Sequence, residues 1–153
     1  MKIFIVTERR ADFSRFKTIL ELIKKEKNMK FILSENAAPP GGHYSQAVKH
    51  NGLLYLSGII PIDKDGNHID VNDFEKQAKQ VLMNADAILK EAGCTKNDVL
   101  KTTVYVADIA NWADFNKIYA EFFDDHKPAR CVVPVSDLHY GFGVEVEMIA
   151  ACE

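Results

Sequence analysis

The stretch Pro128–Glu147, PARCVVPVSDLHYGFGVEVE, decides how this chain folds. Its valine-rich start indicates a strand from Arg130, because β-branched residues favour strands. A turn-like connection with two glycines follows, and a second strand starts at Val144. Alternation along that second strand places Glu145 and Glu147 on one face and the apolar residues on the other. A guanidinium can grip a small carboxylate and a carboxylate can hold or deprotonate a water, so the stretch suggests a site. The same pattern also fits charges on a solvent-facing sheet surface.

The rest of the chain predicts an α+β fold around this pair of strands. Asn51-Gly52 is a strong hairpin signal for a type I′ turn. One apolar stripe predicts a long helix with Asn72 as its N-cap and Gly93 at its C-terminal end. Glu75, three residues after Asn72, is placed to complete a capping box. The expected order is β-β-β-α-β-α-β-β, with two helices on one face of a six-stranded mixed sheet and no cover on the other face. The earlier strands are expected at 31–33, 47–50, 53–56 and 99–107, and the helices at 73–92 and 112–124.

Length and composition exclude several functional classes. A chain of 153 residues suggests one domain with a sizeable core. Its net charge of −3 gives no basic footprint for nucleic acid, and no apolar run approaches the roughly 20 residues that span a bilayer. Cys94, Cys131 and Cys152 show no metal-binding spacing. Their odd number and the lack of a signal peptide predict a reducing, cytoplasmic location.

Eight motifs follow one another along the chain: GHYSQAV (42–48), LSG (56–58), IPID (60–63), QVLMNADAILKEAG (80–93), KTTVYVADI (101–109), DFNKIYAEFF (114–123), PAR (128–130) and VEVEMIA (144–150). In these motifs and their order the chain resembles the RidA/YjgF family of reactive-intermediate deaminases, also called 2-iminobutanoate/2-iminopropanoate deaminases. The resemblance extends from about Met29 to Cys152 and predicts a RidA-like domain over 29–153. Residues 1–28 are then an N-terminal extension, with a possible strand and amphipathic helix, or the product of an upstream start codon.

The resemblance implies a homotrimer with a chorismate-mutase-like fold and with sites between subunits. It also implies hydrolysis of imines and enamines of small 2-keto acids, which releases ammonia. The C=N carbon of such a substrate is already electrophilic, so we expect no cofactor and no metal. The expected partners are 2-imino and 2-keto acids, with neither a membrane nor a nucleic acid among them.

The family's functional residues carry over onto five positions of this chain. Arg130 matches the arginine that binds the substrate carboxylate, and its planar fork suits that role. Glu145 matches the residue that orients the attacking water. Tyr44 matches a tyrosine that lines the same cleft, and Ser57 and Asn116 match further positions near it. From the residues alone, Tyr44 is explained equally well as an ordinary packing aromatic. Hydrogen bonding to nearby backbone is the commoner role of side chains such as Ser57 and Asn116.

This chain departs from the family's pattern at several positions. His43 replaces the usual proline before the tyrosine, Ile59 replaces a common glutamine, and Val132 replaces a cysteine. The connection LHYGFG is also unlike the family's Leu-Pro and short polar turn, so His139 and Tyr140 are expected to reshape the mouth of the pocket. These changes bear on substrate identity more than on reaction type.

Two other functions fit parts of the sequence. A non-catalytic trimer that senses a small carboxylate needs Arg130 alone, whereas hydrolysis also needs Glu145. The family has also carried the label of an RNA-directed translation inhibitor or endoribonuclease. The acidic net charge argues against that activity.

Overall fold

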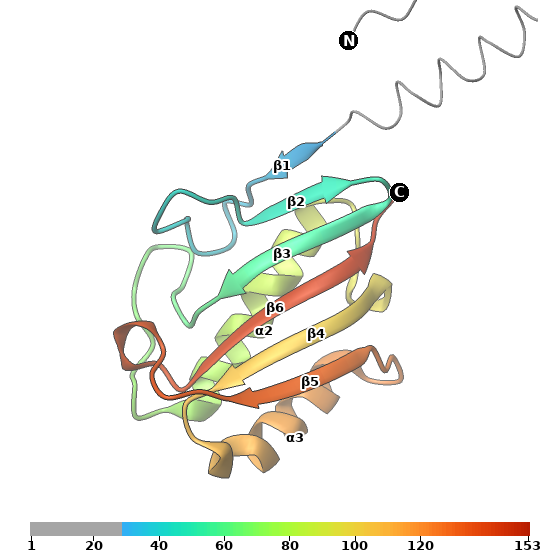
Figure 1. Cartoon of the computed structure of the whole chain (residues 1–153). Coiled ribbons are helices and arrows are strands. Elements are labelled where there is room, and N and C mark those ends of the chain that lie inside the picture. The colour runs from blue at the N-terminus through green and yellow to red at the C-terminus, as the bar shows by residue number, and fades with distance from the viewer. Residues whose placement is uncertain (1–28) are drawn as a thin grey trace, which may run out of the picture.

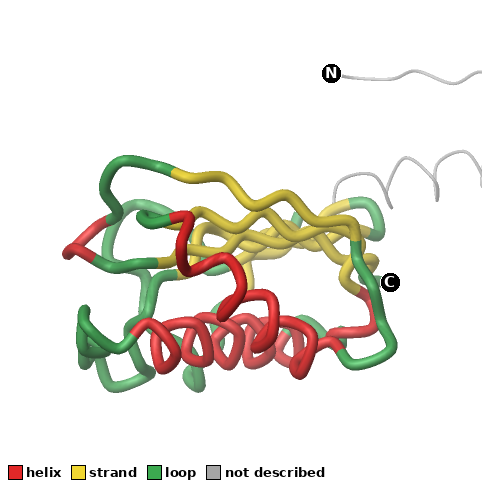
Figure 2. Tube along the Cα trace, turned by 90° about the horizontal axis from the view of Figure 1, so that it is seen from below, coloured by secondary structure: helices red, strands yellow, loops and turns green. Residues whose placement is uncertain are grey.

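A computed structural model describes residues 29–153, and the strand and helix expected within residues 1–28 lie outside this range. Six strands form one sheet in the spatial order β1-β2-β3-β6-β4-β5, with both long helices on one face (Figures 1 and 2). This confirms the predicted α+β order. The elements are β1 (Lys30–Ile32), β2 (Ala47–His50), β3 (Leu53–Ile59), α2 (Phe74–Glu91), β4 (Val99–Val106), α3 (Trp112–Phe123), β5 (Ala129–Pro134) and β6 (Val144–Ala151).

The sheet is mixed because of β5. It pairs in parallel with β4, whereas every other neighbouring pair is antiparallel. A parallel partner needs a crossover, and α3 supplies it. The stretch that decides the fold therefore places β5 at one edge and β6 near the centre, between β3 and β4.

The core lies between the sheet and its helices. Alternate residues of β6, from Val144 to Ala150, are fully or almost fully buried against the apolar stripe of α2. Glu145 and Glu147 point to the other face, as the alternation predicts. The buried residues of α2 are Gln77, Ala78, Val81, Leu82, Asn84, Ala85, Ile88 and Leu89.

Local turn chemistry follows the sequence with one exception. Asn51 and Gly52 both have positive φ, at 51° and 76°, which confirms the type I′ hairpin. Gly93 ends α2 with φ +81°. The predicted cap was wrong: Asp73, not Asn72, caps the helix and accepts a 3.0 Å bond from the Lys76 amide. The Asn72 side chain is instead bound to the Asp70 carboxylate, so the helix begins one residue later than a cap at Asn72 requires.

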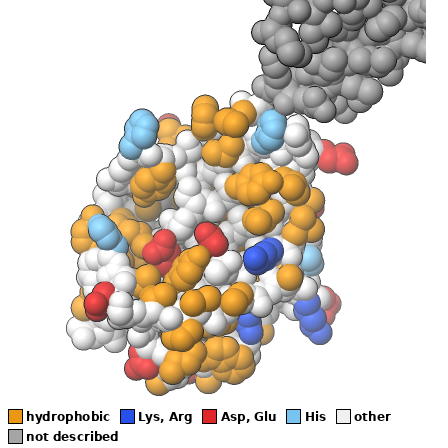
Figure 3. Space-filling model, in the orientation of Figure 1, with side chains coloured by type: hydrophobic (Ala, Val, Ile, Leu, Met, Phe, Trp, Pro, Cys, Tyr) orange, Lys and Arg blue, Asp and Glu red, His pale blue; other side chains and the backbone are white. Residues whose placement is uncertain are grey.

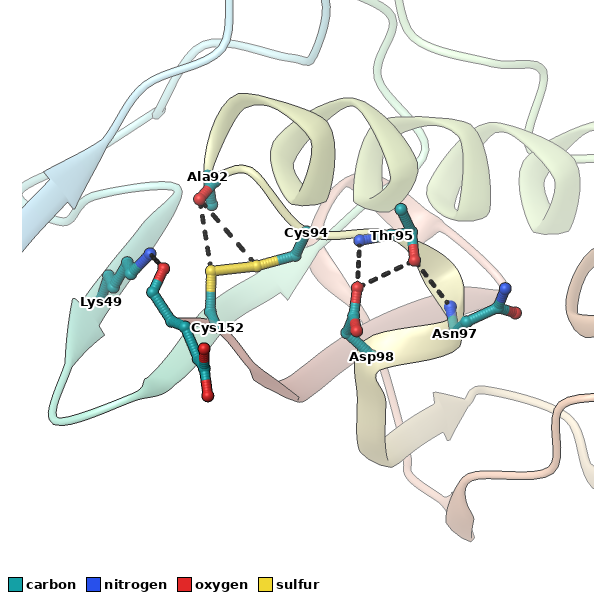
Figure 4. The surroundings of a disulfide bond; sticks show 8 residues. Lys49, Ala92, Cys94, Thr95, Asn97, Asp98 and Cys152 are labelled. Atoms are coloured by element: carbon teal, nitrogen blue, oxygen red, sulfur yellow. Dashed lines mark hydrogen bonds between the residues drawn. A yellow bond between two sulfur atoms is a disulfide. The ribbon is translucent and has the colours of Figure 1, made fainter.

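Two of the three cysteines are bonded to each other. Cys94, just beyond α2, and Cys152, just beyond β6, form a disulfide with a Cα–Cα distance of 5.9 Å (Figure 4). The sequence analysis did not predict this pair, because the two cysteines lie 58 positions apart and form no recognisable motif. The remaining cysteine, Cys131, is free and exposed.

The second face of the sheet carries neither of the helices of residues 29–153 (Figure 2). Hydrophobic side chains spread over this face around acidic ones (Figure 3). Tyr55 is 45% exposed there, and the Tyr105 hydroxyl donates a 3.2 Å hydrogen bond to Glu147. Among the helices of residues 29–153, none combines the length and the hydropathy that crossing a bilayer requires.

Candidate active site

A cleft of about 660 Å³ opens where β3 ends and β6 begins. Its walls come from four segments: the loop before β2, the end of β3 with the loop after it, the middle of α2, and the turn before β6. Most of the lining is apolar, and it includes one glutamate and one histidine. The lining residues are Ala37, Ala38, Pro39, Pro40, Gly41, Gly42, Tyr44, Gln46, Ser57, Gly58, Ile59, Ile60, Ile62, Asn84, Ile88, His139, Tyr140 and Glu145.

Glu145 is the carboxylate of this cleft. It is half-buried on β6 and lies over Gly58 of the neighbouring strand β3. A Cβ built onto Gly58 would stand 1.9 Å from Oε1 of Glu145, so only glycine leaves room for the carboxylate. Burial raises the pKa of Glu145 above its ordinary value, and the charge of Glu147 raises it further. A positive charge on His139 lowers the pKa of Glu145. The carboxyl is therefore a stronger base than an exposed glutamate.

Tyr44 and Ser57 lie in the same cleft, as the family resemblance implied. The Tyr44 side chain is half-exposed, and its hydroxyl accepts a 3.1 Å bond from the Gly41 amide. The Ser57 hydroxyl donates a 2.7 Å bond to the Ser45 carbonyl. Both side chains are thereby held in place, and Ser57 is a wall residue whose proton is already committed.

Arg130 and Asn116 form a second cluster, away from this cleft. The Arg130 guanidinium donates a 2.9 Å bond to the Asn116 side-chain oxygen. Its central carbon stands 4.6 Å from the ring centroid of Tyr119 and 6.0 Å from that of Trp112. These three partners all belong to α3, so Arg130 lies on the helix-covered side of the edge strand β5.

Within one chain, the two clusters lie on opposite faces of the sheet. Arg130 is in register with Thr102, which is buried on the helix side and bonded to the Tyr119 hydroxyl. Glu145 is in register with Tyr105, on the face that the helices leave open. The structure thus brings Glu145, Tyr44 and Ser57 together and pairs Arg130 with Asn116, but it does not join the two groups.

Several wall residues were not assigned a role from sequence. Gly58 was part of a matching motif, and a glycine inside a strand often marks a close approach. His139 and Tyr140 do line the cleft, as the unusual connection suggested. Ile59 also lines it and is nearly buried.

The two remaining departures lie outside the cleft. His43 is exposed beside the cleft without lining it. Val132 packs against the core on the helix side.

These features define an α+β protein with a helix-backed six-stranded sheet and a cleft holding a raised-pKa carboxylate. The family model described as Endoribonuclease L-PSP matches residues 34–152. The chain belongs to this family, which is the RidA/YjgF family.

Curated relatives and solved structures agree with this assignment. A RutC family protein of Pyrococcus horikoshii is 46% identical over 119 residues, covering 78% of this chain and 94% of that protein. The chloroplastic Reactive Intermediate Deaminase A of Arabidopsis thaliana is 34% identical over 151 residues, covering 98% of this chain and 78% of that protein. The crystal structure of E. coli TdcF with bound serine has a TM-score of 0.76 at 33% identity, covering 81% of this chain and 99% of that one.

Proposed function

We propose that the protein is a cofactor-free hydrolytic deaminase that converts reactive 2-imino acids and their enamines to 2-keto acids and ammonia. One observation carries the proposal: a half-buried carboxylate with a raised pKa, Glu145, forms part of the wall of an otherwise apolar cleft. Such a group can take a proton from a water at neutral pH. The relative named Reactive Intermediate Deaminase A supports the same reaction class.

The substrate carboxylate is bound by Arg130 in this proposal. Among the described residues, those lining the cleft include neither lysine nor arginine, so its own chain supplies no guanidinium or ammonium there to bind the substrate carboxylate. An arginine has five N–H donors, and the bond to Asn116 uses one of the donors of Arg130. A bidentate carboxylate contact is therefore compatible with the guanidinium as it stands.

The two clusters come together between subunits in this proposal. Because Arg130 and Glu145 lie on opposite faces of the sheet, Arg130 and Asn116 of one copy complete the cleft of another. The open sheet face, with Tyr55 half-exposed on it, supports assembly through that face. We propose a homotrimer with three equivalent sites.

The reaction follows from these positions. Water bound by Glu145 attacks the C=N carbon, its oxygen forms the new C–O bond, and Glu145 takes one of its protons. The nitrogen gains a proton and the resulting carbinolamine collapses. The C–N bond breaks with its electron pair on nitrogen, ammonia leaves, and the C=O bond forms. The cleft walls exclude bulk water from this sequence and hold the substrate near the carboxylate.

A non-catalytic carboxylate-binding trimer is the second candidate. It is favoured by the likeness to TdcF, whose structure has serine bound. Arg130 alone suffices for this function, whereas Glu145 then has no chemical role.

A coupled assay tests the proposal. A pyridoxal-phosphate threonine dehydratase generates 2-iminobutanoate, and the loss of the imine is followed with and without the protein. We expect acceleration by the wild type, strong loss in Glu145→Gln, and little change in Glu147→Gln, the matched carboxylate two residues along the same strand. Binding of unreactive 2-oxobutanoate without any acceleration would favour the binding trimer instead.

A further inference from the structure

Imine hydrolysis needs a proton donor for the nitrogen as well as a base for the water. In the proposed site Glu145 is the base, so the donor must be another group in the cleft. The hydroxyl of Tyr44 is already engaged with its own loop, because it accepts a bond from the Gly41 amide. His139 also lines the wall, and an imidazole is the side chain that enzymes most often use as a general acid.

The turn before β6 fixes His139 at the cleft. His139–Gly141 form a short 3₁₀ turn, closed by hydrogen bonds from the Gly141 amide to Leu138 and from the Phe142 amide to His139. Tyr140 has φ 59° and Gly141 has φ 76°, which reverses the chain sharply. Phe142 is fully buried and anchors the end of the turn.

Aromatic packing holds the turn from outside. The Tyr140 ring lies 4.5 Å from the His68 ring and 5.9 Å from that of Phe142, measured between centroids. The His139 ring stands edge-on to Tyr140 at 4.6 Å. Tyr140 is thereby a support for the imidazole, and His139 remains exposed beside the cleft.

We propose that His139 is a catalytic residue of the deaminase site, the general acid that protonates the imine nitrogen while Glu145 takes a proton from the attacking water. This inference rests on the proposed function. In the first step the imidazolium gives its proton to nitrogen and the water proton passes to Glu145, which yields the carbinolamine. In the second step Glu145 returns its proton to the nitrogen, the C–N bond breaks, and ammonia leaves. The carbinolamine hydroxyl proton then passes to the imidazole, so both groups regain their starting states.

The surrounding charges favour this division of roles. Two titratable side chains face Glu145, namely Glu147 on β6 and Tyr105 on β4. The neighbour on β3 is Gly58, which lies beneath the carboxylate and has no side chain. Positive charge on His139 lowers the pKa of Glu145 against the effects of burial and of Glu147. An imidazolium at this position thus stabilises the carboxylate form of Glu145, which is the form that takes the water proton.

The test compares pH profiles of imine hydrolysis for the wild type, His139→Gln and His139→Ala. His43→Gln is the control, because His43 is an exposed histidine near the cleft that does not line it. We expect His139→Gln to lower kcat about 100-fold near pH 7 with KM little changed, as general acids typically contribute 10²–10⁴-fold. The wild-type profile should have a basic limb, where activity falls because the general acid has lost its proton, and both variants should lack this limb. Added imidazole should restore activity to His139→Ala.

The outcomes separate this inference from the proposed function. If the wild type hydrolyses imines and His139→Gln keeps the same kcat and the basic limb of the pH profile, His139 is not the general acid and the deaminase proposal stands. A uniform loss at all pH values, without rescue by imidazole, also overturns it, because a structural role predicts that result. A wild type that hydrolyses no imine overturns the deaminase and the acid together. Circular dichroism and molecular mass confirm that each variant is folded and assembled like the wild type.

Discussion

Replacing Gly58 with alanine tests the position of Glu145 without altering Glu145 itself. The added methyl carbon would stand 1.9 Å from Oε1 and 3.0 Å from Cδ of the carboxylate, where real contacts are essentially never under 3.0 Å. The carboxylate must therefore move by roughly 1 Å, and a displacement of that size at a reacting group can cost about 100-fold in rate. We expect kcat for imine hydrolysis to fall by that factor.

The same substitution should cost little stability. The clashing atoms are the far end of a flexible, half-buried side chain, which can rotate toward the cleft instead of straining the backbone. We expect a loss below about 1 kcal/mol, which is roughly 2–4 °C in Tm for a chain of this size. Thermal unfolding and the coupled imine assay together separate displacement of the carboxylate from loss of the fold.

A matched glycine and a double-mutant cycle complete the test. Gly41 also lines the cleft, yet a Cβ there meets nothing within 4 Å, so Gly41→Ala should leave kcat near the wild-type value. In a Glu145→Gln background, Gly58→Ala should have little further effect on kcat, because both changes act on one group. Wild-type activity in Gly58→Ala would refute the argument that the carboxylate reacts from its place over Gly58.

Four further predictions follow from the same geometry. Arg130→Ala should lower kcat/KM by about 30- to 1,000-fold, because it removes a charge-assisted contact worth about 2–4 kcal/mol. Arg130→Lys should restore little of this loss. Wild-type turnover in Arg130→Ala would show that the arginine is not part of the site. Reducing the disulfide between Cys94 and Cys152 should lower the free energy of unfolding in urea by about 4 kcal/mol, because this bond closes a loop of 58 residues. Equal urea midpoints with and without reductant would contradict this prediction. The raised pKa of Glu145 means that the folded state binds its proton more tightly than the unfolded state, so stability falls as pH rises through that range. Glu145→Gln should therefore have a higher Tm than the wild type at neutral pH and the same Tm in acid. A lower Tm of the variant at neutral pH would count against the raised pKa of Glu145. A chain starting at Met29 should keep the mass of a trimer and the activity of the full chain in ultracentrifugation and imine assays, whereas loss of assembly would place residues 1–28 in the core.

Much of the fold could be predicted because its signals are local. Alternation along β6 gives the correct faces for Glu145 and Glu147, and the Asn51-Gly52 pair gives the hairpin. The helix cap could not be placed as well, because Asp70, two residues upstream, competes for the Asn72 side chain. Pairing of distant cysteines depends on where two elements end in space, which periodicity along the chain does not contain.

Part of the candidate site was hidden for a different reason. The close approach of Gly58 to Glu145 depends on the register between β3 and β6, and that register includes a shift between Leu56 and Ile59. A sequence motif can include the glycine without revealing what lies above it. The family resemblance supplied Tyr44 and the serine of the cleft, whereas spacing alone did not favour them over ordinary packing residues.

The sequence analysis treated Arg130 and Glu145 as parts of one site, but the structure separates them, and this separation is the strongest argument for assembly. Arg130 shares its strand parity with Val132, which packs against the core, whereas Glu145 lies between the buried residues Val144 and Val146. The cation therefore belongs to the helix side and the carboxylate to the open side, and no side-chain rotation carries either one through the sheet. If both act on one substrate, as we propose, they must come from different copies. Each chain then contributes two different surfaces to its neighbours, and a closed ring with such heterologous contacts contains as many complete sites as subunits. Mixing Arg130→Ala chains with Glu145→Gln chains should consequently restore activity, because some sites in the mixed rings receive both wild-type groups.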